Sequence, residues 1–437
     1  MSPLQPQPAG LPSGTFGGRR SARAGTWSWP RLLAAPHRLA FWAGSLMLGL
    51  TALWWGGVLA ARAAGLALPW AVSPTTAHAL LMAFGFLPMF MAGFIFTAGP
   101  RWLGLAPVPG RQLVVPVLVQ LGGWALALAG FHVSAPLAAL GVALAAVGFA
   151  LATGLLALML LESRVTDRDH ARLVLLGCSV AVVAQWAAAV LLALGLQTAV
   201  LAAVQAALWG GLALVFVAVA HRMIPDVTQG ALPAVSAWHP RALLGLLALL
   251  VAVQAPFAAA EVLAGGTLPA APAALRAAIE LPGGALLLWL SLRWGLRQSL
   301  SVRLLAMLHL GFFWLGVSFT LGGVSHVLMS TSGGSLSLGL APLHAFTMGF
   351  LGSLLLAMAT RVACGHSGRP VQAGPWVWLM FWALQVAVLA RVAAALWPQA
   401  GTPLTLLAAQ FWLGAMGAWA LKHAPWFGQP RVDGGAG

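Results

Sequence analysis

The sequence contains no tyrosine, only two cysteines and only seven acidic residues among its 437 positions. Cys178 and Cys364 are far apart and have no metal-ligand spacing, so neither a disulfide framework nor a thiolate metal site is indicated. Charged residues make up 7% of the chain, 61% is hydrophobic, and apolar runs long enough to span a bilayer recur throughout. The sequence is therefore typical of a polytopic membrane protein, and we expect the lipid bilayer to be its main partner.

The formal net charge of +15 would suggest nucleic-acid binding in a soluble protein. Here the arginines lie in short stretches between apolar runs, where they set membrane orientation, so we expect no nucleic-acid partner. If the helices alternate in direction, 19 of the 22 Lys and Arg residues fall on one side, and only Arg62, Arg276 and Arg391 fall on the other. This bias predicts that both termini are cytoplasmic.

Windows of about 20 apolar residues predict an all-α bundle of about twelve transmembrane helices. The predicted spans lie near residues 41–61, 76–98, 112–131, 137–161, 173–194, 199–221, 242–262, 272–293, 304–325, 338–361, 375–397 and 402–421. Residues 37–424 are predicted to form one transmembrane domain. Residues 1–36, rich in Pro, Gly, Ser and Arg, are expected to be a disordered cytoplasmic tail, and residues 425–437 a short second tail.

The segment HALLMAF, which begins at His78, is echoed by HAFTMGF, which begins at His344. Both segments start predicted helices that run inward from the outer side, so both histidines lie within about the first two turns and at one depth. Met82 and Met348 follow four residues later on the same helix face, where packing is their expected role. The shared depth favours two sides of one pocket over an internal duplication.

An imidazole in hydrocarbon is costly unless it is paired, and a functional site is the usual reason to keep one. The alternative is a histidine bonded to a carbonyl or hydroxyl group of a neighbouring helix. Two neutral imidazoles that face each other between apolar walls suit a low-spin haem iron, which makes His78 and His344 candidate ligands. Arg391, near the outer end of the predicted eleventh helix, is the first candidate to bind a haem propionate, with interfacial snorkelling as its alternative. Arg62 and Arg276 are weaker candidates for that role.

A second set of histidines, His221, His309 and His366, is predicted near the cytoplasmic side. With neighbouring arginine and aspartate residues they are candidates to bind copper or an anion, although loop histidines are often simply solvated. His326, at the outer end of the predicted ninth helix, is a candidate to join the outer pair. The remaining histidines lie in predicted termini or loops and are expected to be solvated: His37, His132, His170, His239 and His423.

Three segments together resemble the NnrS family of haem- and copper-containing membrane proteins, which belong to the response to nitric oxide and to denitrification: HALLMAFGFLPMFMAGFIFTAGPRWLG, RMIPDVTQGALP and HAFTMGFLGSLLLAMATRVACGHSGRP. The resemblance implies haem b, copper, a nitric oxide context and the bacterial inner (cytoplasmic) membrane. It places the polar residues of those motifs at His78, His344, Arg361, His366 and Arg369.

The chain departs from that family at one point. Members often carry a second His and a Glu after the first His of the second helix, and here Leu80 and Leu81 stand in those places. If those two residues help to bind a second metal, that site is expected to be altered or absent in this chain.

The first of the three segments also resembles the second helix of subunit I of haem–copper oxidases. Those proteins are bundles of about twelve helices, in which the second and tenth helices supply low-spin haem ligands near the outer face. An oxygen-reducing proton pump is nevertheless not expected, because the chain has no tyrosine, few acids and no histidine in its predicted seventh helix.

Three functional hypotheses remain open. The first is a haem-binding redox or sensing protein of the nitric oxide response, served by a membrane or periplasmic electron donor. The second is a transporter of a small ligand, metal or haem, with histidines along its path. The third is an enzyme that turns over nitric oxide at haem or copper, although a bis-histidine iron has no open position and favours electron transfer.

Overall fold

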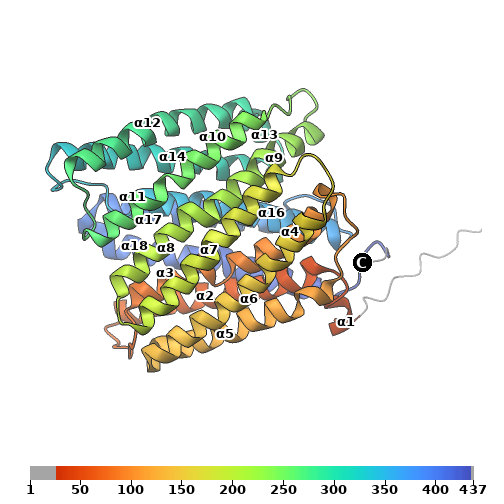
Figure 1. The fold of residues 1–437 in the computed structure, drawn as a ribbon, viewed down its shortest axis with the longest axis horizontal. Coiled ribbons are helices and arrows are strands. Elements are labelled where there is room, and N and C mark those ends of the chain that lie inside the picture. Colours follow the sequence, from red (N-terminus) through yellow and green to blue (C-terminus); the bar gives the residue numbers. More distant parts are fainter. Residues whose placement is uncertain (1–25, 435–437) are drawn as a thin grey trace, which may run out of the picture.

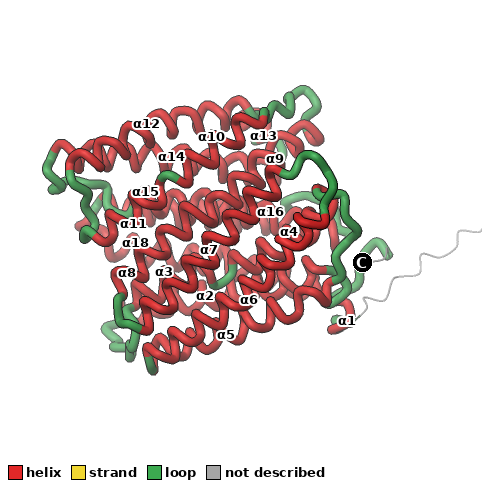
Figure 2. The backbone as a smooth tube through the Cα atoms, viewed as in Figure 1, coloured by secondary structure: helices red, strands yellow, loops and turns green. Residues whose placement is uncertain are grey.

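The computed structural model describes residues 26–434. All regular secondary structure in this range is helical, and the helices lie side by side with the connecting loops gathered at two ends (Figures 1 and 2). Twelve helices of the described range are long and apolar enough to cross a membrane, which confirms the predicted number. They are Pro36–Ala63, Pro74–Trp102, Gly110–Val133, Ala135–Glu162, Asp169–Ala193, Gln197–Ala231, Arg241–Leu263, Ala270–Arg293, Arg303–Thr331, Ala341–His366, Pro375–Leu396 and Pro398–Phe427.

Most of the spans are longer than the apolar windows suggested. The sixth continues to Ala231 and the twelfth to Phe427, while the first begins at Pro36. Within the range expected to be a tail, Trp29–Leu32 form the short helix α1. Residues 1–25, which make up most of that tail, lie outside the described residues.

The first and last parts of the described chain meet at one end of the bundle, on the right in Figure 1. The Ser28 amide donates to the Gly428 carbonyl at 3.0 Å, and the Arg38 guanidinium donates to the carbonyls of Phe427 and Gln429. We call this the terminal end and the opposite one the far end. Because successive spans alternate in direction, the second, eighth and tenth spans begin at the far end.

Several spans are interrupted helices. The straightforward spans contain α2 (Pro36–Ala63), α5 (Val114–Val133), α6 (Ala135–Glu162), α7 (Asp169–Ala193), α12 (Ala270–Arg293), α14 (Arg303–Thr331) and α17 (Pro375–Leu396). The interrupted spans are α3 (Pro74–Phe84) with α4 (Leu87–Trp102), α8 (Gln197–Ala207) with α9 (Ala213–Ala231), α10 (Arg241–Ala252) with α11 (Gln254–Leu263), α15 (Ala341–His344) with α16 (Ser353–His366), and α18 (Gly401–Trp412) with α19 (Ala418–Phe427). The π-helical segments η2 (Leu208–Leu212), η3 (Ala345–Gly352) and η5 (Leu413–Gly417) connect three of these pairs. Short pieces complete the described chain: η1 (Gly110–Leu113), α13 (Leu296–Ser299) and η4 (Pro398–Ala400).

Glycines allow α5 and α6 to pack backbone against backbone. A Cβ atom at Gly123 would lie 2.3 Å from the Ala145 amide nitrogen, and one at Gly141 would lie 2.3 Å from that of Ala127. Close approach through small residues is how membrane helices gain van der Waals contact where no hydrophobic effect drives them together. The outward side of α6 carries exposed leucines, including Leu161, as expected of a surface that meets lipid.

Candidate functional site

The helix that carries His78 is fixed at both of its ends. Its N-cap residue Ser73 accepts a hydrogen bond from the Thr76 amide on its hydroxyl at 3.2 Å, and Pro74 occupies the first turn. The helix ends at Phe84, because Pro88 has no N–H for the Phe84 carbonyl and the chain must restart as α4. His78 thus lies in the second turn of a short helix, α3, at the far end.

His344 stands at a different kind of irregularity. It is the last residue of α15, and the π-helical segment η3 begins directly after it. Phe346 of this segment stacks on Trp209 of the other π segment, η2, with ring centroids 4.1 Å apart. Behind the segment, a Cβ at Gly349 would lie 2.6 Å from the Trp314 ring. Single π-helical turns often mark functional sites, and this one orients His344 relative to α16.

The His78 imidazole has an aromatic neighbour but no hydrogen-bond partner among the described residues. Its ring stacks on Trp55 of α2, with centroids 4.0 Å apart and planes inclined by 25°. Its Nδ1 atom is buried, and neither ring nitrogen forms a hydrogen bond with any described residue. The sequence offered a neighbouring carbonyl or hydroxyl group as the alternative to a functional role, and the structure contains no such partner among the described residues.

His344 uses one ring nitrogen and leaves the other open. Its Nδ1 lies 2.9 Å from the Leu340 carbonyl oxygen, so the Nδ1–H donates and Nε2 carries the lone pair. No described residue forms a hydrogen bond with Nε2. A histidine held through Nδ1–H by a backbone carbonyl is the usual arrangement of a metal ligand that binds through Nε2.

Arg391 of α17 completes this group. It interacts electrostatically with both His78 and His344, and the two imidazoles interact with each other. The guanidinium is partly buried and forms neither a hydrogen bond nor an ion pair with any described residue. The structure therefore gathers His78, His344 and Arg391, which we call the open histidine site, at the far end. Arg62, the weaker candidate on α2, is exposed.

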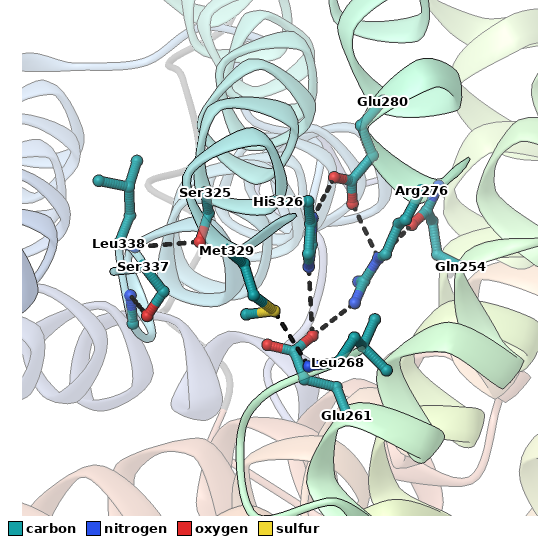
Figure 3. A network of polar contacts seen from close by, with 11 residues as sticks. Gln254, Glu261, Leu268, Arg276, Glu280, Ser325, His326, Met329, Ser337 and Leu338 are labelled. Atoms are coloured by element: carbon teal, nitrogen blue, oxygen red, sulfur yellow. Dashed lines mark hydrogen bonds and ion pairs between the residues drawn. The ribbon is translucent and has the colours of Figure 1, made fainter. Parts of the chain in front are cut away.

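The third arginine on the predicted outer side belongs to a separate cluster (Figure 3). Arg276 of α12 donates through Nε to the Gln254 side-chain oxygen at 3.0 Å and to Glu280 at 3.1 Å, and through Nη1 to Glu261 of α11 at 2.5 Å. His326 of α14 joins the same carboxylates, with Nδ1 2.6 Å from Glu280 and Nε2 3.4 Å from Glu261. Both nitrogens of His326 and the guanidinium of Arg276 are thus committed within this paired network. It consists of Gln254, Glu261, Arg276, Glu280 and His326.

The three histidines expected near the cytoplasmic side bond to different partners. The Nδ1 atom of His221 lies 3.0 Å from Nε2 of His170, and His309 Nε2 bonds to the Thr228 hydroxyl at 2.8 Å. His366 packs on the ring of His37 at a centroid distance of 3.9 Å. No two of the three candidates form a ring contact or hydrogen bond with each other.

The expectation that loop and terminal histidines are solvated was wrong for three of them. His37, His170 and His423 are buried. The reason is that the helices are longer than their apolar windows: His37 lies in the first turn of α2, His170 in the first turn of α7, and His423 within α19. The Ala-Pro pair before His37 was the available signal, because proline is favoured in the first turn of a helix.

No group of three or more His, Cys, Asp or Glu side chains in the described range is arranged to hold a metal ion. A haem iron needs only two axial ligands from the protein, since the porphyrin supplies the other four. The open histidine site fits that requirement: it has one orphaned buried imidazole nitrogen, one free Nε2 atom and one unpaired guanidinium.

The comparison with protein families agrees with the resemblance seen in the sequence. The family described as "NnrS protein" matches residues 31–431, nearly the whole chain. The chain therefore belongs to the NnrS family. No curated protein matches it.

Proposed function

We propose that this NnrS-family membrane protein binds haem b, with His78 and His344 as axial ligands and Arg391 as the partner of a propionate. The observation that carries the proposal is the contrast inside His344, whose Nδ1–H is held by the Leu340 carbonyl while Nε2 has no described partner. Imidazole nitrogens without a hydrogen-bond partner, as in His78 and at Nε2 of His344, are costly in a membrane interior unless a ligand binds them.

Haem b would supply one-electron redox chemistry at this site. If both His78 and His344 bind the iron, no position would be left open for a gas, which would favour electron transfer. Arg391 would neutralise a propionate carboxylate, and the Trp55 ring would hold the His78 plane and exclude water. Family membership supports a role in the nitric oxide response or denitrification, with an electron donor at the outer face of a bacterial inner membrane.

The test is a reduced-minus-oxidised spectrum of the purified full chain with haem quantification. We expect a low-spin b-type signal in the wild type and its loss in His78→Ala and His344→Ala. Arg391→Met should keep the signal and change its midpoint potential. His423→Ala, a buried histidine at the terminal end, is the matched control and should leave the spectrum unchanged. Wild-type protein without haem, or both ligand variants with an unchanged signal, would contradict the assignment.

Copper is a second proposal, and the structure favours His221 over His309 and His366 as its ligand. His221 has two further imidazoles beside it, with His170 at 3.0 Å and the ring of His239 at a centroid distance of 5.4 Å, whereas His366 has one, His37. Imidazole is a good copper ligand. Metal analysis should show copper lost in His221→Ala and retained in His309→Ala; equal copper in both variants would remove the proposal.

Transport of a small ligand remains the alternative function, and nitric oxide turnover a further one. Substrate flux in proteoliposomes that does not depend on the redox state would favour transport. Turnover at haem would require one axial histidine to leave the iron, and a change from low-spin to high-spin signal during nitric oxide consumption would reveal it.

A further inference from the structure

The paired network places two carboxylates, one guanidinium and one imidazole where water is nearly excluded. The side chains of Arg276, Glu280 and His326 are 6%, 5% and 4% exposed. If His326 were neutral and both glutamates ionised, the cluster would carry a net charge of −1 in a low-dielectric environment. Such an uncompensated charge is strongly unfavourable inside a membrane protein.

The contacts of His326 indicate that the cluster holds one proton more than it would with a neutral His326 and two ionised glutamates. Each ring nitrogen faces a carboxylate oxygen, Nδ1 that of Glu280 and Nε2 that of Glu261. A neutral imidazole can donate from only one nitrogen, so its other lone pair would face the lone pairs of a carboxylate. The contact becomes attractive when one proton is added, either on the imidazole or on the carboxylate. With that proton the cluster is neutral.

One member of the network is more exposed than the others. Glu261 is 24% exposed, several times more than its partners. It lies near the C-terminal end of α11, which is the half of the seventh span nearer the far end (Figure 1). The loop at the far end begins directly after Leu263. Glu261 is therefore the most exposed member of the network and lies next to the far-end loop, so it is the group best placed to exchange a proton with water there.

The seventh span is interrupted next to this cluster. Pro256 has no N–H for the Ala252 carbonyl, and α10 ends at Ala252 while α11 begins at Gln254. The Gln254 oxygen accepts from Arg276 at the break, and its buried Nε2 has no partner. Polar contacts to Arg276 and His326 consequently link the half-helix α11 to α12 and α14.

We propose that Glu261, Glu280 and His326 form a proton-binding site at the far end of the bundle, separate from the open histidine site and exchanging its proton with water through Glu261. A proton from water passes to the Glu261 carboxylate and then to Nε2 of His326, while the proton on Nδ1 remains bonded to Glu280. Release follows the reverse path and changes the cluster charge from 0 to −1. The groups that face His326 are Glu261 from α11 and Arg276 and Glu280 from α12.

The chain offers a favourable experiment, because it contains only three glutamates, Glu162, Glu261 and Glu280. Full-length protein labelled with carboxyl-13C glutamate would be titrated in lipid nanodiscs and followed by infrared difference spectroscopy, with 15N-histidine NMR in parallel. We expect one proton per chain to bind to the cluster and to change the labelled-carboxylate and imidazole signals at the same pH. His326 should be doubly protonated at neutral pH, and its signal should be assigned by its loss in His326→Gln.

Two variants make the result decisive. Glu162 is exposed, so Glu162→Gln should remove only an ordinary carboxylate titration. Glu261→Gln leaves Arg276 and Glu280 as a neutral pair and should abolish proton binding at His326. The proposal is overturned if His326 is neutral and singly protonated at neutral pH in the wild type, or if Glu261→Gln leaves its titration unchanged. The NMR readout in wild-type protein stands even if Glu261→Gln fails to fold.

Discussion

The open histidine site and the paired network lie at the same end of the same bundle, yet they treat buried polarity in opposite ways. In the network, carboxylates, guanidinium and imidazole are bonded to one another within 3.4 Å. At the open site, His78 has no polar partner and His344 has one, the Leu340 carbonyl of its own helix turn. Arg391 is unpaired within the described residues.

This difference distinguishes buried polar groups that stabilise the fold by bonding to one another from buried polar groups that are available to bind a ligand. A buried group that is fully bonded becomes costly when one partner is removed, because the other is left uncompensated. A buried group without partners is already costly, so an apolar replacement relieves the folded state. The two regions should therefore respond to mutation in opposite directions, and this can be tested from the largest effect to the smallest.

Arg276→Met should have the largest effect, because it leaves two buried carboxylates with one imidazole. We expect a loss of about 3–5 kcal/mol in the free energy of unfolding, measured by thermal or denaturant unfolding in detergent. Arg62→Met, which removes an exposed arginine at the same end, is the control and should change little. Equal stability of the two variants would show that the paired network does not stabilise the fold.

Replacing a histidine by leucine in each region should separate the two sites directly. His326→Leu should cost about 1–3 kcal/mol, since it leaves the buried Glu280 carboxylate without one of its two hydrogen-bond donors. His78→Leu in haem-free protein should change stability by less than about 1 kcal/mol, because the loss of the Trp55 stack is offset by removal of an unpaired imidazole. A large loss in the His78 variant would mean that its nitrogens have partners in the absence of haem.

Each region also has a glycine packed closely against it. Replacing each glycine by alanine compares how the two regions respond to an added methyl group. A Cβ at Gly322 would lie 2.9 Å from the Glu280 carboxylate, and one at Gly349 would lie 2.6 Å from the Trp314 ring. We expect both alanine substitutions to destabilise the protein by about 1–3 kcal/mol. Gly349→Ala alone should alter the haem spectrum, because η3 sets the position of His344. An altered spectrum in Gly322→Ala would show that the two sites are coupled.

The smallest effect on stability is expected at the exposed ion pair between Asp167 and Arg241. The Arg241 guanidinium lies 3.1 Å from the carboxylate and lowers the pKa of Asp167 below its ordinary value of 3.8. The ion pair therefore stabilises the fold at pH values above the ordinary pKa of the carboxyl group, and this stabilisation is lost as the pH falls through the lowered pKa of Asp167. Because both side chains are about half exposed or more, we expect Asp167→Asn to cost about 0.5 kcal/mol or less at neutral pH. A comparison of unfolding at neutral pH and below pH 3.8 would measure it, and a cost above 1 kcal/mol at neutral pH would contradict the ranking.

Sequence reasoning reached the number of spans, because apolar windows of helix-spanning length are readable in the sequence. It nominated His78, His344 and Arg391 together from their predicted depth, but depth does not show that helices are neighbours, and their role as a haem site stays a prediction. The paired network was missed, although Glu261, Arg276 and Glu280 are charged residues within the apolar stretches of two predicted spans. Its assembly depends on how three helices rotate about their axes, which hydrophobic windows do not encode. The buried histidines were missed for a related reason, since windows of apolar residues end before the helices do.

The π-helical segment after His344 also has a consequence for insertions and deletions. An α-helix turns by about 100° per residue, so one residue added to or removed from a span rotates everything beyond it by that angle. The wider turn of the π-helical segment η3 introduces such a rotation between α15 and α16. A residue in α15 and a residue in α16 therefore do not share a face according to the usual α-helical spacing. Deletion of one residue between Ala345 and Gly352 would bring the two helices into a common phase and rotate His344 relative to α16, although His344 itself had not been changed.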